Sequence, residues 1–340
     1  MKKPGMAEGL MVAAGVCLAA LAWAGPGFGK PLLTQELIGR AETDREARQQ
    51  LLAAVLADVG EETPFGAEDV QSFRTSRGDL TGDAAPETVL VLEFGPRDTL
   101  AAAYQTGSDG QSLEYMGKVG DFYQIEQVEF LPIRALDREI VLLREYANQG
   151  LGAFEETRTV RGYAWDAEAG AFRQVLSLAP RIQATWNGLW DYDRDVVAQH
   201  QEAANPALTN RWERVVQEGD LYFYGGEGPL ARETIALDMI QKYQVALDSP
   251  GDKVPGTASF QTLRERTVRE TYVWDEDWSR FIVEEAVDNR TREPVAVLTD
   301  LANGPYTLVE GFAEQAAYVR ALYRDGRIDT VERAALSREQ

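Results

Sequence analysis

The chain has 340 residues, with 55 Asp and Glu against 34 Lys and Arg, so its formal net charge is −21. The length allows about one to three domains, and the 44% of hydrophobic residues exclude whole-chain disorder, a collagen and a small disulfide-rich scaffold. The acidity argues against binding to nucleic acid, which needs a basic surface, and the single Cys and single His exclude zinc sites built from several such ligands.

Residues 1–24 have the features of a secretory signal peptide. Two lysines stand near the start, and the apolar run at 10–21 is shorter than the roughly 20 residues that cross a bilayer. The segment 22–24 (Ala-Trp-Ala) has small residues at the positions that a signal peptidase reads. We therefore expect a secreted or cell-envelope protein (periplasmic or extracellular) with no membrane span after processing. An uncleaved N-terminal anchor is the alternative.

Residues 25–76 are predicted to hold a linker and an N-terminal helical segment. The linker, at 25–33, is rich in Gly and Pro. A helix is predicted at 44–59, because apolar residues recur there at helical spacing and Thr43 and Glu46 fit a capping box.

Residues 77–180 show a different pattern, in which short apolar runs alternate with turn residues. Such runs are typical of β-strands. The predicted strands are residues 88–94, 100–104, 113–119, 125–131, 140–146, 157–165 and 172–178.

Residues 181–300 are predicted to form a second β-rich region with one helix. A strand at 221–224 leads into that helix, at 229–247, and a hairpin covers about 264–287. Residues 301–340 are predicted to form a C-terminal helical hairpin.

An internal repeat is the most informative feature of the sequence. Residues 158–166 read RTVRGYAWD, and residues 266–275 read RTVRETYVWD. Each segment is followed by a short acidic turn and then by an aromatic residue, Phe172 or Phe281. The pattern predicts two hairpins in which a Trp pairs with a Phe across the strands.

A looser repeat links residues 87–94 with residues 139–146. Units of about 50–60 residues, each with a buried strand and a hairpin, are typical of β-propeller blades. We therefore predict a mainly β protein with helical additions (α+β), built from propeller-blade-like units. A β-sandwich is the alternative.

The sharpest local motif is the segment 79–87, Asp-Leu-Thr-Gly-Asp-Ala-Ala-Pro-Glu, which runs directly into a predicted strand. Oxygen donors stand at alternate positions, and such a loop can wrap them around one calcium ion. The predicted ligands are the side chains of Asp79, Thr81, Asp83 and Glu87 and the carbonyl oxygen of Ala85.

This motif resembles the calcium loop of the FG-GAP/VCBS family of extracellular repeats, and the resemblance covers about residues 77–178. It implies propeller blades and assigns the four side chains above as calcium ligands. Two departures are present. Ala84 stands where the family has a second glycine, and the corresponding stretch of the next unit keeps only Asp137 and Glu139.

Two other acidic segments have partial EF-hand spacing. Residues 191–202 place acids at suitable positions, but Val196 stands where glycine is needed, and we interpret the segment as a solvated acidic loop. Residues 325–332 match only the second half of such a loop, and we interpret them as the turn of the predicted helical hairpin.

No catalytic residue is assigned from the sequence. His200 is the only histidine, and there is no Gly-x-Ser-x-Gly motif. The acidic runs 275–277 and 284–285 could supply the two carboxylates of a glycosidase, but we interpret them as solvated. Five aromatic residues could stack on sugars, although core packing is the favoured interpretation. They are Trp186, Trp190, Trp212, Tyr222 and Tyr224.

The sequence thus predicts a secreted or envelope-exposed, non-catalytic binding or structural module that is stabilised by calcium. Its expected partner is an extracellular protein or a polysaccharide. The alternative function is a carboxylate-based glycan hydrolase of the cell envelope.

Overall fold

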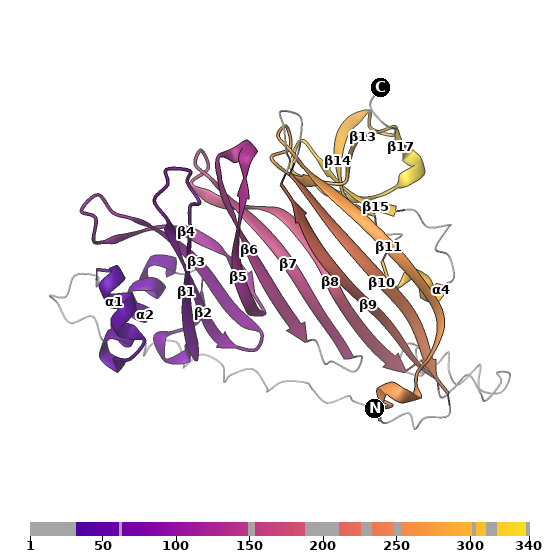
Figure 1. The fold of residues 1–340 in the computed structure, drawn as a ribbon, viewed down its shortest axis with the longest axis horizontal. Coiled ribbons are helices and arrows are strands. Elements are labelled where there is room, and N and C mark those ends of the chain that lie inside the picture. The colour runs from indigo at the N-terminus through magenta and orange to yellow at the C-terminus, as the bar shows by residue number, and fades with distance from the viewer. Residues whose placement is uncertain are drawn as a thin grey trace, which may run out of the picture.

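The computed structural model describes most of the chain and shows a mainly β protein with a few helices (Figure 1). The described residues are 32–60, 63–148, 154–187, 211–225, 233–247, 253–300, 304–310 and 318–337. The predicted signal peptide, the acidic segment 191–202 and His200 lie outside them. Within the described residues, no helix is long and apolar enough to cross a membrane.

The strands of the described residues form three antiparallel sheets, and within each sheet strands that follow one another along the chain pair with one another, except that β17 pairs with β13. The first sheet has the order β1 (Ser72–Gly78), β2 (Glu87–Gly95), β3 (Asp98–Thr106) and β4 (Leu113–Phe122). The second sheet runs from β5 to β12: β5 (Gln124–Ile133), β6 (Arg138–Asn148), β7 (Phe154–Asp166), β8 (Ala171–Asn187), β9 (Trp212–Tyr224), β10 (Thr234–Ala246), β11 (Gln261–Asp275) and β12 (Arg280–Ile282). The third sheet has the order β16 (Ile328–Glu332), β15 (Tyr318–Tyr323), β14 (Glu293–Asp300), β13 (Glu284–Asp288) and β17 (Leu336–Ser337).

Two N-terminal helices, α1 (Gln35–Ala41) and α2 (Arg45–Val59), cover one face of the first sheet (Figure 1). The predicted helix at 44–59 is confirmed. Its N-cap is Asp44 and not Thr43, because the Asp44 carboxylate accepts a hydrogen bond of 2.8 Å from the Glu46 N–H. The fully buried residues Leu51 and Val55 of α2 join the core beneath the helices.

The first sheet is sandwiched between these helices and the second sheet. In β2, Leu90 and Leu92 belong to the core under the helices. Val89 and Val91 point the other way and pack with Val141 of β6. This burial on both faces explains why β2 is a continuous apolar run and not an alternating one.

All seven strands predicted between residues 77 and 180 coincide with strands β2 to β8. The predicted helix at 229–247 is wrong, because residues 234–246 form β10 at the centre of the second sheet. Ile235, Met239 and Tyr243 are buried four residues apart, and this spacing fits a helix stripe and one face of a strand equally well.

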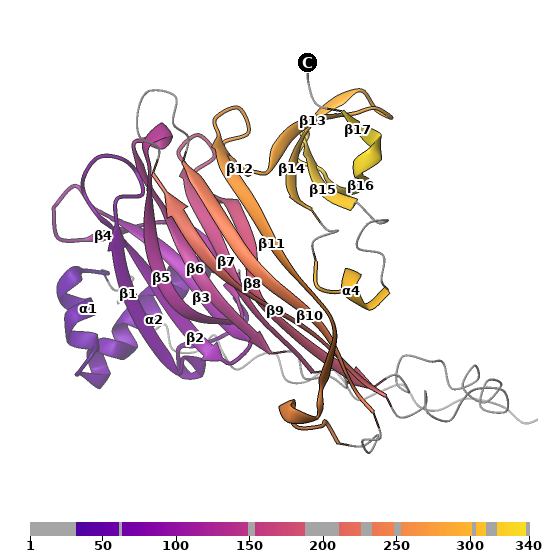
Figure 2. The same ribbon diagram turned by 45° about the vertical axis from the view of Figure 1, so that its right-hand side comes forward.

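The predicted C-terminal helical hairpin is also wrong. Residues 318–332 form the β-hairpin β15–β16, with Val319, Ala321 and Tyr323 buried at alternate positions. Gly326 turns the chain with a φ of 86°. A short α-helix, α4 (Thr307–Glu310), precedes this hairpin and lies along the second sheet near β11 (Figure 2).

The repeated segments form equivalent hairpins, as predicted. The first is β7–β8, in which Trp165 pairs with Phe172 and the ring centroids are 5.1 Å apart. The second is β11–β12, in which Trp274 pairs with Phe281 at 5.3 Å. The second strand of this second hairpin is short, because β12 pairs with only the last three residues of β11.

The looser repeat corresponds to β2 and β6, which lie in different sheets. Both strands contribute to the core between the first and second sheets. The structure therefore confirms a β-rich fold with helical additions, arranged as sheets of four, eight and five strands.

Candidate functional site

The predicted calcium loop lies between β1 and β2, and its carboxylates are turned toward its own backbone. Asp79 accepts hydrogen bonds from the N–H groups of Gly82, at 2.7 Å, and Ala84, at 3.1 Å. Asp83 accepts one from the Ala85 N–H at 2.8 Å. These short-range contacts are the turn-forming bonds that Asp makes in acidic loops with or without a metal.

Glu87, the last predicted ligand, is buried beneath this loop. Its carboxylate accepts hydrogen bonds from the Leu80 N–H at 2.6 Å and from the Thr81 N–H and Oγ1, both at 3.2 Å. Burial raises the pKa of Glu87, although these bonds act in the opposite direction. Glu139 of β6 accepts a further hydrogen bond, 2.8 Å long, from the Asp79 N–H and anchors the loop to the second sheet.

The assignment of five calcium ligands in this loop stays a prediction. Their side chains lie on one short loop, as the sequence requires, but much of their hydrogen-bonding capacity is used in closing it. Asp137 and Glu139 of the next unit lie close by: Gly82 packs against the Asp137 carbonyl, and Glu139 binds the Asp79 N–H.

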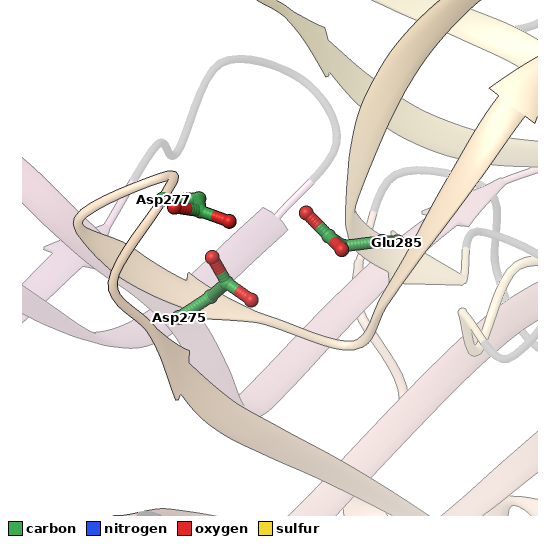
Figure 3. Close-up of side chains that lie close together, drawn as sticks. All are labelled: Asp275, Asp277 and Glu285. Atoms are coloured by element: carbon green, nitrogen blue, oxygen red, sulfur yellow. The ribbon is translucent and has the colours of Figure 1, made fainter. Parts of the chain in front are cut away.

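Within the described ranges, three acids are brought together elsewhere, at Asp275, Asp277 and Glu285 (Figure 3). Each offers a carboxylate oxygen, and these three atoms all lie within 4.8 Å of one another. Asp275 ends β11, Asp277 lies in the turn to β12, and Glu285 is on β13. The triad therefore lies where the chain leaves the second sheet and enters the third.

Trp278 fixes the geometry of this acidic triad. Its backbone N–H donates to Asp275 at 3.1 Å, and its indole Nε1–H donates to Glu285 at 2.5 Å. Arg324 lies 3.8 Å from the centroid of the Trp278 ring and donates to the Asp277 carbonyl at 2.8 Å. The tight turn and the buried indole thus hold the carboxylates of Asp275 and Glu285 toward one another, while Arg324 binds the main chain at Asp277.

The donor set of the triad suits a hard divalent cation. Three carboxylate oxygens are what calcium or magnesium prefers, and water can complete either coordination shell. Asp275 is buried, Glu285 is half-buried and Asp277 is exposed, so one side of the group is open to solvent. The sequence interpretation of these acids as solvated missed the triad. The sequence shows the carboxylates in two short acidic runs. Whether the two runs lie side by side depends on the path of the chain through β12.

A long groove crosses one face of the second sheet. Its volume is about 1000 Å³, and residues from strands β5 to β11 line it. Tyr222 and Ile240 expose 43% and 45% of their surface there and give the groove two large apolar side chains that are open to solvent. Acids and arginines alternate around them: Glu126, Glu218, Asp220, Asp238, Arg144, Arg158 and Arg181.

The aromatic residues considered for sugar stacking divide into two groups. Trp212 is fully buried and Trp186 is half-buried, so core packing is correct for these two. Tyr222 and Tyr224 are exposed on β9, on the face that carries the groove. Tyr222 lines the groove itself, whereas the Tyr224 hydroxyl accepts a 3.4 Å hydrogen bond from Arg269. Trp190 lies outside the described residues.

The chain was also compared with known proteins. No protein-family model matches it, and no curated protein matches it. The functional assignment therefore depends on the residues and the geometry alone.

Proposed function

We propose that this protein is an exported, non-catalytic binding module of the cell envelope that holds an extended ligand in the groove of its second sheet. The groove is the observation that carries the proposal. Between an extracellular protein and a polysaccharide, the two expected partners, the groove favours a polysaccharide. An exposed aromatic ring can stack on a sugar face, and the carboxylates and guanidinium groups around it can bind sugar hydroxyls.

A rigid sheet suits this task because it fixes the positions of the contacting side chains before the ligand arrives. Ion pairs between strands of the second sheet hold several of the groove side chains in place. Arg158 pairs with Glu126 at 3.1 Å, and Asp238 pairs with Arg269 at 3.4 Å. Export is supported by the N-terminal signal pattern, and it would bring the groove into contact with envelope polymers.

A divalent cation, most simply calcium, is proposed to bind at the acidic triad and to stabilise the module. An ion there would join the β11–β12 turn to β13 and so fasten the third sheet to the second. The loop at 79–87 is retained as a second, weaker calcium site by its resemblance to FG-GAP/VCBS repeats. Because its carboxylates already accept hydrogen bonds from its own backbone, we expect an ion there to add little stability and the triad to account for the calcium-dependent part. Kinship with that family and a blade-like origin of the hairpin units are part of this proposal.

One observation favours the alternative of a glycan hydrolase. Asp275 and Glu285 are about as close as the carboxyl groups of retaining glycosidases, which are about 5 Å apart. However, Trp278 binds both carboxylates, and neither of them lines the groove. A hydrolysis screen with the Glu285→Gln variant as control tests this alternative, which requires activity that the variant lacks.

The binding proposal is tested on an array of cell-envelope polysaccharides. We expect binding that Tyr222→Ala weakens about tenfold or more, because that ring would be a central contact. Tyr224→Ala is the matched control, since Tyr224 is equally exposed on the same strand but does not line the groove. An absence of binding to any polysaccharide, or an equal loss in both variants, would contradict the proposal.

A further inference from the structure

A small pocket lies at the seam between the second and third sheets. Its volume is about 110 Å³, which is room for about four water molecules. Strands β8, β11 and β12 form one wall, and strands β14, β15 and β16 form the other. Its polar lining consists of Gln174, Ser177, Tyr272, Arg280, Thr299 and Arg320. Every one of these side chains can donate a hydrogen bond.

Arg280 is the unusual residue of this pocket. It is half-buried, and its Nε atom is fully buried with no hydrogen-bond partner in the part of the chain that the structure describes. Burial, together with the charges of Arg173 and Arg320, lowers the pKa of Arg280 to about 10. The charged groups that act on Arg280 are thus both cations, so its own charge is destabilised.

The carboxylates nearest to the pocket have other partners. Glu270 accepts a hydrogen bond from the Tyr272 hydroxyl, and Asp300 lies 3.6 Å from Arg333. Arg173 donates to the Ser279 carbonyl at 3.2 Å. Among the described residues, neither Arg280 nor Arg320 forms an ion pair. The lining of the pocket thus contains two guanidinium groups and no carboxylate.

We propose that this pocket is a binding site for a small oxyanion, a phosphate, sulfate or carboxylate group. The guanidinium groups of Arg280 and Arg320 would supply the charge, and the hydroxyl groups of Ser177 and Thr299 would supply further donors. An oxyanion there would accept hydrogen bonds from the two guanidinium groups and offset the positive charges of Arg173 and Arg320 beside Arg280. This proposal is independent of the polysaccharide groove, which other residues line.

Isothermal titration with inorganic phosphate, sulfate and acetate, each at constant ionic strength in chloride, tests the proposal. We expect saturable binding of at least one anion with one site per chain, and its ranking over the others identifies the chemical class. Arg320→Gln should weaken that binding about tenfold or more, because a charged donor is lost from an exposed strand position. Arg45→Gln, at an exposed arginine of α2 that does not line the pocket, should leave binding unchanged.

A second variant separates binding from a structural role. Arg280→Met should abolish anion binding, yet in chloride buffer its melting temperature should equal or exceed that of the wild type, because an unpaired buried charge is removed. No saturable binding of any of the three anions would overturn the proposal. So would binding that survives in both variants, or a melting temperature of Arg280→Met that falls equally with and without anion.

Discussion

The loop at residues 79–87 and the triad of Asp275, Asp277 and Glu285 are two acidic groups within the described residues, and they are built in different ways. In the loop, all carboxylates come from nine consecutive residues, and they accept hydrogen bonds from the N–H groups of the same nine residues. In the triad, the carboxylates come from a strand end, a turn and the next sheet.

This difference teaches that closeness in sequence favours the backbone as a partner for acidic side chains. Asp and Glu within a tight turn meet free N–H groups before they meet one another, and these bonds partly neutralise them. Carboxylates brought together from separate elements have fewer N–H groups within reach, so their mutual repulsion is left for a cation to relieve. The predictions below test this contrast.

The largest effect is expected for Glu87→Ala. The change leaves the buried N–H groups of Leu80 and Thr81 without their acceptor, and we expect a loss of about 3 kcal/mol in the free energy of unfolding, measured by urea denaturation. The loss should be the same with calcium and with a chelator. Glu87→Gln, which keeps one acceptor oxygen, should lose less. A loss of stability that appears only when calcium is present would make Glu87 a metal ligand instead.

A middle-sized effect is expected from calcium at the triad. Saturating calcium should raise the melting temperature of the wild type by several degrees, because the ion binds only the folded arrangement. Glu285→Gln should lose this rise, whereas Asp79→Asn should keep most of it. If Asp79→Asn loses the rise and Glu285→Gln keeps it, then the loop is the stabilising site and the contrast between the two groups is reversed.

The smallest effect is expected for Asp83→Ala. Asp83 is exposed and accepts one local hydrogen bond, so the melting temperature should change by less than about 2 °C in a chelating buffer. Differential scanning fluorimetry with and without calcium gives the comparison. A calcium-dependent change several times larger would show that this carboxylate binds an ion.

The sequence predicted the secondary structure correctly where the pattern of apolar residues and turns is typical of only one type of element. The helix at 44–59 was predictable from its amphipathic spacing, although its N-cap is Asp44 and not Thr43, and β2 to β8 were predictable from short apolar runs bounded by turns. The Trp and Phe pairs of the two hairpins were predictable because the repeat placed them on both sides of a tight turn.

The errors in the predicted secondary structure arose where tertiary contacts decide whether a segment is a helix or a strand. Ile235, Met239 and Tyr243 are four residues apart, so only the pairing of β10 with β9 and β11 distinguishes a strand from a helix. Val319, Ala321 and Tyr323 of the C-terminal hairpin instead alternate with less buried residues, and the helical interpretation overlooked this strand pattern. The triad was not predictable, because the three residues of β12 decide whether Glu285 returns to Asp275.

The shortness of β12 affects the tendency of these molecules to associate with one another. Because β12 covers only residues 273–275 of β11, the rest of that strand is an open sheet border within the described region. Such a border invites a strand from another molecule, and charged side chains discourage it. β11 carries Arg264, Glu265, Arg266, Arg269 and Glu270. Arg264 and Arg266 also donate hydrogen bonds to main-chain carbonyls of the segment around α4. These bonds hold that segment beside the open border of the sheet. These charges and this segment therefore oppose strand pairing between the eight-stranded sheets of two molecules.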